Sequence, residues 1–402
     1  MKAPEADPRM LRRVEGLVFV TVFLDLVGFG IVIPLLPFYV QSMGGSPRTV
    51  GVLLGCFAFT QLLATPVLGR RSDRHGRRPV ILLSLVTNAI AMGLFALASY
   101  ERLLPLLFIS RILAGATSGN IAACQASIAD LTTPDTRARA MGRVGAGIGL
   151  GLVLGPLFGG LLAEWGAWFP PLAAGALAFL GATGVLLLMP ETHPPEARSR
   201  SQAPSRMTVL RETHRRRALT IILLLYFLVF LAMTTLQVAL ALLAQERLGW
   251  SSREVGYAFA LVGGLGLLIQ GALIGPLSSI VGEVRLLVLG ALLFSAGLLG
   301  VGLASNPSMM IGAVVLIGTG MGFIQPLLSS LASQAANPSH QGLTLGLAQS
   351  SGGLARTVGP VASGALYSSL GSSAPFAAGA AVVLVAAALG AQLKHEGLGK
   401  KK

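Results

Sequence analysis

Long runs of apolar residues, interrupted by short polar turns, follow one another along the whole of this 402-residue chain. A helix needs about 20 predominantly apolar residues to cross the ~30 Å hydrocarbon core of a membrane. Because only 11% of the residues are charged and 53% are hydrophobic, lipid is the solvent for most of the folded surface. We therefore predict an all-α polytopic membrane protein whose twelve spans are 17–40, 50–68, 79–98, 103–129, 141–163, 167–189, 218–243, 254–276, 285–304, 308–330, 342–367 and 374–393.

The lysines and arginines orient the chain in the membrane. If both termini lie inside, 24 of the 30 basic residues fall on inner segments and only four on outer loops. This is the positive-inside bias of membrane insertion, so we expect both termini in the cytoplasm. The same bias accounts for the net charge of +14, which predicts attraction to anionic lipid and no nucleic-acid partner.

The spans divide into two halves. A proline- and arginine-rich stretch, 190–217, predicts a cytoplasmic linker between a bundle of six helices at 17–189 and a second at 218–393. It leaves an N-terminal segment, 1–16, and a basic tail, 394–402, on the cytoplasmic side. Glycines at 69 and 76 recur at 275 and 282, and Gly-Pro at 155–156 recurs at 359–360, which indicates a duplicated unit. Such repeats place a substrate site between the halves, with alternating access by rocking.

Asp25 is the only acidic residue well inside a predicted span. At 1.5 Å per residue it lies about 12 Å from the inner end of its helix, near the midplane of the membrane. A carboxylate at this depth is costly unless it is paired, protonated or hydrated, which favours a proton or cation site. The alternative is a protonated side chain that caps a helix break at Pro34 and Pro37.

Arg111, in the fourth span, lies about 6 Å from the level of Asp25 along the membrane normal. The two side chains could therefore meet or share a cavity, and a proton could be bound or released there as solvent access changes. The alternative is a structural arginine that donates to backbone carbonyls.

The basic turn between the second and third spans contains two glycines that permit a tight reversal and one aspartate among five arginines. Asp130, at the inner end of the fourth span, is within plausible reach of Arg74 or Arg77. The turn serves either as an orientation signal alone or as part of an inner charge network that holds the halves closed. Single exposed ion pairs contribute at most about 1 kcal/mol, so only a network would bias the rocking. The predicted gating residues are Gly69, Asp73, Arg74, Gly76, Arg77, Arg78 and Asp130.

Glycines surround a proline in the fifth span. Because glycine lets helices approach closely and proline bends them, we expect tight contact at a moving interface. Close packing without a conformational role is the alternative. The residues are Gly142, Gly151, Gly155, Pro156, Gly159 and Gly160.

Arg356, in the eleventh span, is the other arginine in mid-bundle and has no obvious acidic partner in the second half. It could complement an anionic group of a substrate or reach Asp25. Aromatic and polar side chains from other spans predict a mostly apolar cavity with a few polar groups, although hydrogen bonds between helices explain each one equally well. The set is Phe29, Phe59, Asn88, Asn120, Tyr226, Gln237, Gln270, Phe323, Gln325 and Gln349.

Enzyme chemistry finds no support in the sequence. Cys56 and Cys124 lie inside spans, without a disulfide framework or metal-ligand spacing. All five histidines lie outside the spans, and HExxH, GxSxG and Walker-type phosphate motifs are absent. We expect a monomeric protein that is not an enzyme, binds no metal or cofactor, and draws its energy from a proton gradient.

At these residues the chain resembles the major facilitator superfamily, and within it the twelve-span drug:proton antiporters related to bacterial tetracycline efflux proteins. The turn 69–78 resembles the loop motif Gly-x-x-x-Asp-Arg-x-Gly-Arg-Arg, and residues from Gly142 resemble the antiporter motif Gly-x8-Gly-x3-Gly-Pro-x2-Gly-Gly. The stretch from Asp25 to Pro37 resembles the first-span motif of these exporters. Arg111 with Gly115 resembles their fourth-span motif, which is associated with proton coupling. The resemblance implies the major facilitator fold, with two six-helix bundles.

Residues and resemblance together predict a proton-coupled efflux transporter of a bacterial inner membrane that exports amphipathic or lipophilic small molecules. Tetracycline exporters are expected to carry further acids in the third and ninth spans, but 79–98 and 285–304 contain none. Asp25 is thus the only embedded carboxylate, and a tetracycline–metal complex is not the expected substrate. A lipid or lysolipid transporter of the same fold is the alternative, favoured if apolar grooves open sideways to the bilayer.

Overall fold

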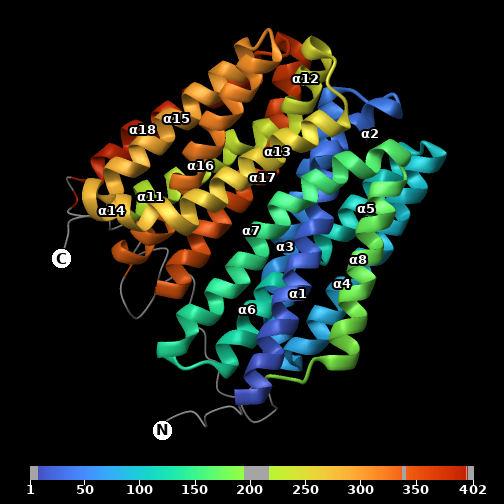
Figure 1. The fold of residues 1–402 in the computed structure, drawn as a ribbon, viewed down its shortest axis with the longest axis vertical. Helices are drawn as coiled ribbons and strands as arrows, with labels where there is room; N and C mark the ends of the chain where they lie inside the picture. Colours follow the sequence, from blue (N-terminus) through green and yellow to red (C-terminus); the bar gives the residue numbers. More distant parts are fainter. Residues whose placement is uncertain (1–7, 194–216, 337–340, 395, 397–402) are drawn as a thin grey trace. The chain divides into compact units, whose positions relative to one another are not determined.

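The computed structural model describes residues 8–193, 217–336, 341–394 and 396, and every regular element within them is a helix (Figure 1). The all-α prediction is confirmed. Most of the predicted linker 190–217 and of the tail 394–402 lies outside the described residues, as do the first seven residues of the segment 1–16.

The chain forms two compact units, which we describe separately. Unit 1 comprises residues 1–43 and 59–202, and unit 2 comprises residues 44–58 and 203–402. The first twelve residues of α3 (Pro47–His75) thus group with the second unit, whereas the linker-based division placed them in the first half.

The other helices before the linker correspond to the predicted spans one and three to six. They are α1 (Pro8–Val32), the turn η1 (Ile33–Leu35), α2 (Leu36–Ser42), α4 (Arg77–Glu101), α5 (Leu104–Ala116), α6 (Asn120–Leu131), α7 (Pro134–Leu162), the turn η2 (Ala163–Trp165) and α8 (Phe169–Leu188).

The helices after the linker correspond to the predicted spans seven to twelve. They are α11 (Arg217–Thr235), η3 (Leu236–Leu240), α12 (Ala241–Leu248), α13 (Ser252–Leu268), η4 (Ile269–Leu273), α14 (Ile274–Val281), α15 (Glu283–Leu303), α16 (Pro307–Ala335), α17 (Gln341–Leu370) and α18 (Ala374–Gln392). Here η3 and η4 are π-helical turns, which interrupt spans seven and eight and which hydropathy did not predict.

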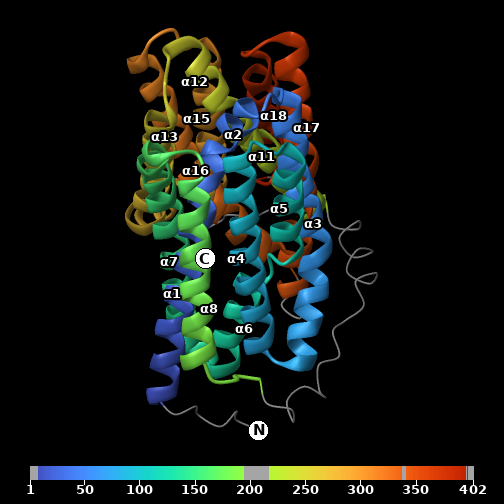
Figure 2. The same cartoon turned by 90° about the vertical axis from the view of Figure 1, so that its right-hand side faces the viewer.

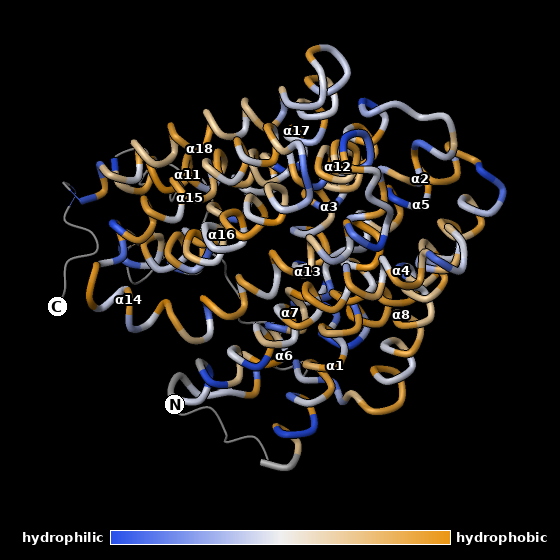
Figure 3. Tube along the Cα trace, turned by 45° about the horizontal axis from the view of Figure 1, so that its top comes forward, coloured by the Kyte–Doolittle hydropathy of each residue, from blue (hydrophilic) through white to orange (hydrophobic). Residues whose placement is uncertain are grey.

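Apolar residues run along nearly all of these helices, and hydrophilic residues gather at their ends (Figure 3). Among the described residues, eleven helical segments are long and apolar enough to cross a membrane. The eleventh predicted span, α17, has the length but falls outside that set, because glutamine, serine, threonine and Arg356 interrupt its apolar sequence.

In unit 1, α1 packs against α7 and α8, and α4 packs against α8 and α5 (Figure 2). Val14, Val18 and Val22 recur every four residues on α1, so they lie on one face of the helix. This face is buried in a core that includes Ile81 of α4 and Ile128 of α6. The apolar period of α1 therefore sets which side of Asp25's helix faces the bundle.

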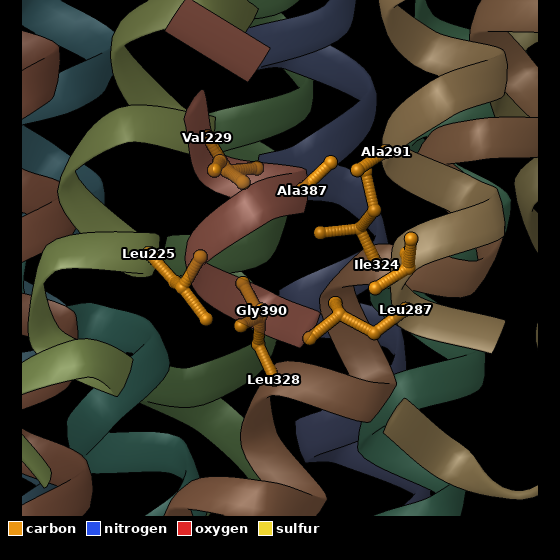
Figure 4. Close-up of a pocket in the computed structure, with 10 residues that line it drawn as sticks. Leu225, Val229, Leu287, Ala291, Ile324, Leu328, Ala387 and Gly390 are labelled. Atoms are coloured by element: carbon orange, nitrogen blue, oxygen red, sulfur yellow. The ribbon is translucent and has the colours of Figure 1, made fainter. Parts of the chain in front are cut away.

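In unit 2, α15 packs against α16 and α18, and α11 packs against α17 and α18. A small apolar cavity of about 10 Å³ remains among these helices, bounded by side chains such as Leu225, Leu287 and Ile324 (Figure 4). It has room for no more than one water, and its apolar side chains offer such a water no hydrogen bonds. It is therefore a packing defect rather than a binding site.

The turn before the third span recurs in the second unit. Gly76 has φ +105° and ψ 161°, and Gly282 has φ +90° and ψ 146°. Their N–H groups donate to Ser72 O and Ser278 O over 3.1 and 3.0 Å. Each pair is 206 residues apart, so the backbone supports the duplication indicated by the sequence. The left-handed conformation also explains why both positions hold glycine.

Candidate functional site

Asp25 lies half-buried on α1, within unit 1. Asn88 Nδ2, from α4, donates a hydrogen bond to Asp25 Oδ1 over 3.3 Å. Asn120, the first residue of α6, lies near enough to interact electrostatically with this carboxyl group. Its own Nδ2 is buried and has no hydrogen-bond partner among the described residues. Two predicted cavity residues therefore surround the predicted proton site.

The fourth span breaks beside this carboxyl group, which the sequence analysis did not predict. Helix α5 ends at Ala116, and α6 begins at Asn120. The Thr117 hydroxyl donates to Leu113 O over 3.0 Å, an alternative to regular helical bonding. Gln61 Nε2 of α3 donates to Ser118 Oγ over 2.8 Å within the break. The signal that could have revealed it is the sequence Gly-Ala-Thr-Ser-Gly at 115–119.

Arg111 does not contact Asp25. Its guanidinium lies 4.6 Å from the centre of the Phe95 ring and donates to Met92 Sδ over 3.4 Å. The side chain is only 2% exposed, and none of its ion pairs or hydrogen bonds in the described residues reaches an acid. Of the two arrangements considered, direct contact between the side chains is therefore not seen, and a shared cavity stays a prediction. Helix α5 packs against α4, and its rotation directs Arg111 toward that helix.

The charges at the turn between α3 and α4 form a network in unit 1. Arg77 pairs with Asp73 Oδ1 at 2.5 Å through Nη1 and with Asp130 Oδ2 at 2.9 Å through Nε. Its side chain is 9% exposed, so water screens these pairs less than it screens surface pairs. Arg74 is exposed and makes no ion pair among the described residues. Of the two arginines considered for Asp130, the structure selects Arg77.

Glu191 is a member of this network that the sequence analysis missed. Its carboxylate accepts the backbone N–H groups of Arg77 at 2.9 Å and Arg78 at 3.3 Å, at the start of α4. Arg78 in turn donates to Leu186 O of α8. An acid at a helix N-terminus is favourable because the first N–H groups lack intrahelical partners. The network thereby joins neighbouring ends of α3, α4, α6 and α8.

The glycines of the fifth span form a contact between α7 and α1 inside unit 1. A Cβ added to Gly151, Gly155 or Gly159 would lie 2.6, 2.7 or 2.3 Å from atoms of α1. Gly30 of α1 faces Pro156 at the same contact. Gly142 faces open space and does not take part, and Gly160 is buried. We call the contact of Gly151, Gly155 and Gly159 with α1 the glycine seam.

The remaining cavity residues lie in different surroundings. Tyr226 is buried, and its hydroxyl lies 3.0 Å from Ser329 Oγ. Phe323 packs against Gly290 of α15 in the core of unit 2. Gln325 Nε2 lies 3.9 Å from Met233 Sδ. Phe29 and Gln237 are half-buried, whereas Phe59, Gln270 and Gln349 are exposed.

Arg356 lies half-buried on α17 in unit 2. Its guanidinium carbon lies 4.7 Å from the centre of the Phe230 ring on α11. The Phe230 ring stacks on Tyr226 with centroids 6.1 Å apart. Phe230 is thus a site residue that the sequence analysis missed, because nothing in the sequence distinguishes it from the other aromatic residues of its span.

An apolar groove of about 360 Å³ lies in unit 1 among α1, α7 and α8. Phe23 and Val27 of α1, Phe158 of α7 and Leu177 of α8 line it, and every other lining residue is also apolar. The Phe158 side chain is 42% exposed beside it. Such a groove has the chemistry to hold an acyl chain or another lipophilic group.

Comparisons with known proteins find relatives that match most of this chain. The family model of the Major Facilitator Superfamily matches residues 18–273 and 222–397. The tetracycline resistance protein, class C, of Escherichia coli is 33% identical over 360 residues, which cover 88% of this chain and 89% of that protein. Major facilitator superfamily domain-containing protein 10 of Homo sapiens is 30% identical over 422 residues, with 91% and 90% covered. The crystal structure of the human organic anion transporter MFSD10 superposes with a TM-score of 0.70 and 26% identity, covering 96% of this chain and 100% of that one.

Proposed function

This chain belongs to the major facilitator superfamily, and from that premise we propose that it is a proton-coupled exporter of amphipathic or lipophilic small molecules. It would act by alternating access in the cytoplasmic membrane of a bacterium, with both termini inside. The observation that carries the proposal is the surroundings of Asp25, a lone acid in the first span held by Asn88 beside the break in the fourth span.

Asp25 is suited to exchange a proton rather than to hold a permanent ion pair. Charge at mid-membrane is costly without a partner, and the described residues give this carboxyl group amides but no arginine or lysine. An amide N–H can donate to the ionised form, so Asn88 lowers the cost of releasing the proton. Protonation would then depend on whether water reaches the site, and alternating access changes that in each transport cycle.

The charge network around Arg77 and the glycine seam would let the first bundle move as one body. Arg77 holds α3 to α6, and Glu191 holds the start of α4. Rocking requires that the helices of a bundle stay together while access changes. We therefore propose that Arg77 with its acidic partners, and the glycine seam, act by keeping this bundle rigid. We also propose, as a second role, that the charges of this network hold the two halves closed on the cytoplasmic side.

The test is gradient-driven transport by Asp25→Asn in proteoliposomes, with Glu101→Gln as the control. Glu101 is an exposed acid at the end of α4, so its loss should leave transport unchanged. Asp25→Asn should abolish uphill export of a lipophilic dye driven by a pH gradient, while the dye still binds to the purified protein. Uphill export by Asp25→Asn at the wild-type rate would refute the assignment.

A lipid or lysolipid transporter is the second candidate, and the apolar groove of unit 1 favours it. The relatives do not distinguish the two candidates, since one is called a tetracycline resistance protein and the other an organic anion transporter. Lysolipid that raises the thermal stability of the purified protein, together with no binding of lipophilic dyes, would select the lipid transporter. Dye binding that lysolipid does not displace would select the exporter.

A further inference from the structure

The described spans hold three charged side chains near mid-membrane: Asp25, Arg111 and Arg356. Arg111 is sealed inside unit 1 at 2% exposure. Arg356 is only half-buried, so a ligand can reach it. In unit 2 the structure shows an arginine that is both deep in a span and accessible.

Arg356 lies at the middle of its span. Fourteen residues follow it before α17 ends at Leu370, and fifteen precede it from Gln341. At 1.5 Å per residue both ends of the helix are about 21 to 23 Å away. The guanidinium group cannot extend from there to the headgroup region, as a lysine or arginine near a helix end does.

The side chain is held by an aromatic ring rather than by an acid. The ring of Phe230 contacts its guanidinium, and none of the ion pairs or hydrogen bonds of the described residues involves Arg356. A contact with a ring face orients a guanidinium but accepts none of its five N–H groups. The guanidinium N–H groups therefore remain available to donate hydrogen bonds to a ligand.

The local sequence is shaped to bring this ring to the arginine. Gly352 lies one turn before Arg356, and a Cβ there would lie 2.8 Å from Phe230 Cδ2. Glycine therefore lets the ring approach α17 closely. Behind Phe230, Tyr226 stacks on the ring and keeps its hydroxyl near Ser329 Oγ. Cation, apolar ring and hydroxyl thus follow one another across α17, α11 and α16.

We propose that Arg356 binds the anionic group, a carboxylate or sulfonate, of an amphipathic substrate whose aromatic part packs beside Phe230 and Tyr226. Guanidinium pairs with two oxygens of such an anion through two parallel N–H···O bonds, which an ammonium group cannot form. This inference rests on the proposed transport function, because it names the substrate class that the transporter selects. Lipophilic cations would be disfavoured at this site.

The experiment uses a matched pair of radiolabelled probes, 1-naphthaleneacetate and its neutral amide, 1-naphthaleneacetamide. Kd is measured for both probes by scintillation proximity on the purified full-length protein. The variants are Arg356→Gln and Arg356→Lys, with Arg285→Gln, an exposed arginine at the start of α15, as the control. Thermal unfolding of each variant verifies that it is folded.

The wild type should bind the carboxylate about ten- to a hundredfold more tightly than the amide, as expected for a hydrogen bond to a charged group. Arg356→Gln should lose that preference while keeping its Kd for the amide. Arg356→Lys should keep only part of the preference, and Arg285→Gln should match the wild type. Loss of amide binding together with carboxylate binding in a folded Arg356→Gln protein would show a structural arginine and overturn the inference.

Equal binding of the two probes by the wild type, or binding of neither, would also overturn it. The two proposals fail separately. If carboxylate binding depends on Arg356 but no transport is driven by a pH gradient, the proton-coupled function is refuted and the anion site is supported. Gradient-driven export of a neutral dye, without preference for the carboxylate probe, would leave the function and remove the anion site.

Discussion

Replacing Gly159 with alanine should destabilise the protein, because the new methyl group would meet backbone rather than a side chain. The added Cβ would lie 2.3 Å from Ile31 O, 2.9 Å from Ile31 Cα and 3.0 Å from Ile31 C. A side chain could rotate away from such a clash, but the backbone of α1 cannot. The two helices must separate by about 1 Å to restore ordinary contact distances.

The size of the effect follows from overpacking. Extra atoms forced into a close-packed interior cost about 1 to 3 kcal/mol. Gly142→Ala is the matched control, since Gly142 lies on the same helix and nothing lies within 4 Å of its added Cβ. In the control, the better helix propensity of alanine should stabilise the protein by about 1 kcal/mol. The two substitutions are chemically identical, so their difference isolates the contact with α1.

The assay is the apparent melting temperature of the detergent-solubilised protein, followed by the fluorescence of its three tryptophans. Two of them, Trp165 and Trp168, lie in unit 1 and report on the bundle that contains the glycine seam. Gly159→Ala should melt several degrees below the wild type, and Gly142→Ala should melt at or above it. Equal melting temperatures for the two variants would refute the close approach of α7 to α1.

Two further substitutions test other parts of the structure by the same assay. Gly390→Ala should raise the melting temperature, because its Cβ would make ordinary contacts of 3.6 Å with Leu287 and 3.8 Å with Val288 beside the apolar cavity, and better helix propensity adds about 1 kcal/mol; a lower melting temperature would contradict the packing described. Arg77→Gln should cost about 2 kcal/mol through the lost charge-assisted bonds to Asp73 and Asp130. As the control, Arg71→Gln changes an exposed arginine and should leave the melting temperature unchanged. An equal fall in melting temperature for both arginine variants would contradict the charge network around Arg77.

The sequence predicted the spans and the family because both depend on composition along the chain. Each predicted span coincides with helix in the structure, and the superfamily and the absence of an enzyme function are confirmed. The sequence also identified Asp25, since an acid inside an apolar run is visible without any fold. The roles of the site residues remain predictions.

Other features were beyond sequence reasoning because they depend on how each helix is rotated about its axis. One residue along a helix turns the side chain by about 100°, so depth in the membrane says little about direction. Arg111 and Asp25 lie at similar expected depths in the membrane. Yet the Arg111 side chain turns toward the Phe95 ring, and Asp25 accepts a hydrogen bond from Asn88. Hydropathy also passes over the break at 117–119, because three small polar residues hardly lower the average of a long apolar run.

Local sequence was enough to predict which segments are long and apolar enough to cross a membrane, where glycine is required, and which charges lie inside those segments. The side that the basic turns face stays a prediction. Hydrophobic transfer and glycine's backbone freedom act locally, so no knowledge of neighbouring segments is needed for them. The partners of these residues are known only from the folded chain: α1 for the glycine seam, Arg77 for Asp130, and Phe230 for Arg356. These contacts join residues that lie 53 apart for Asp130 and Arg77, 126 apart for Arg356 and Phe230, and 128 apart for Gly159 and Ile31. No local pattern specifies packing over such distances.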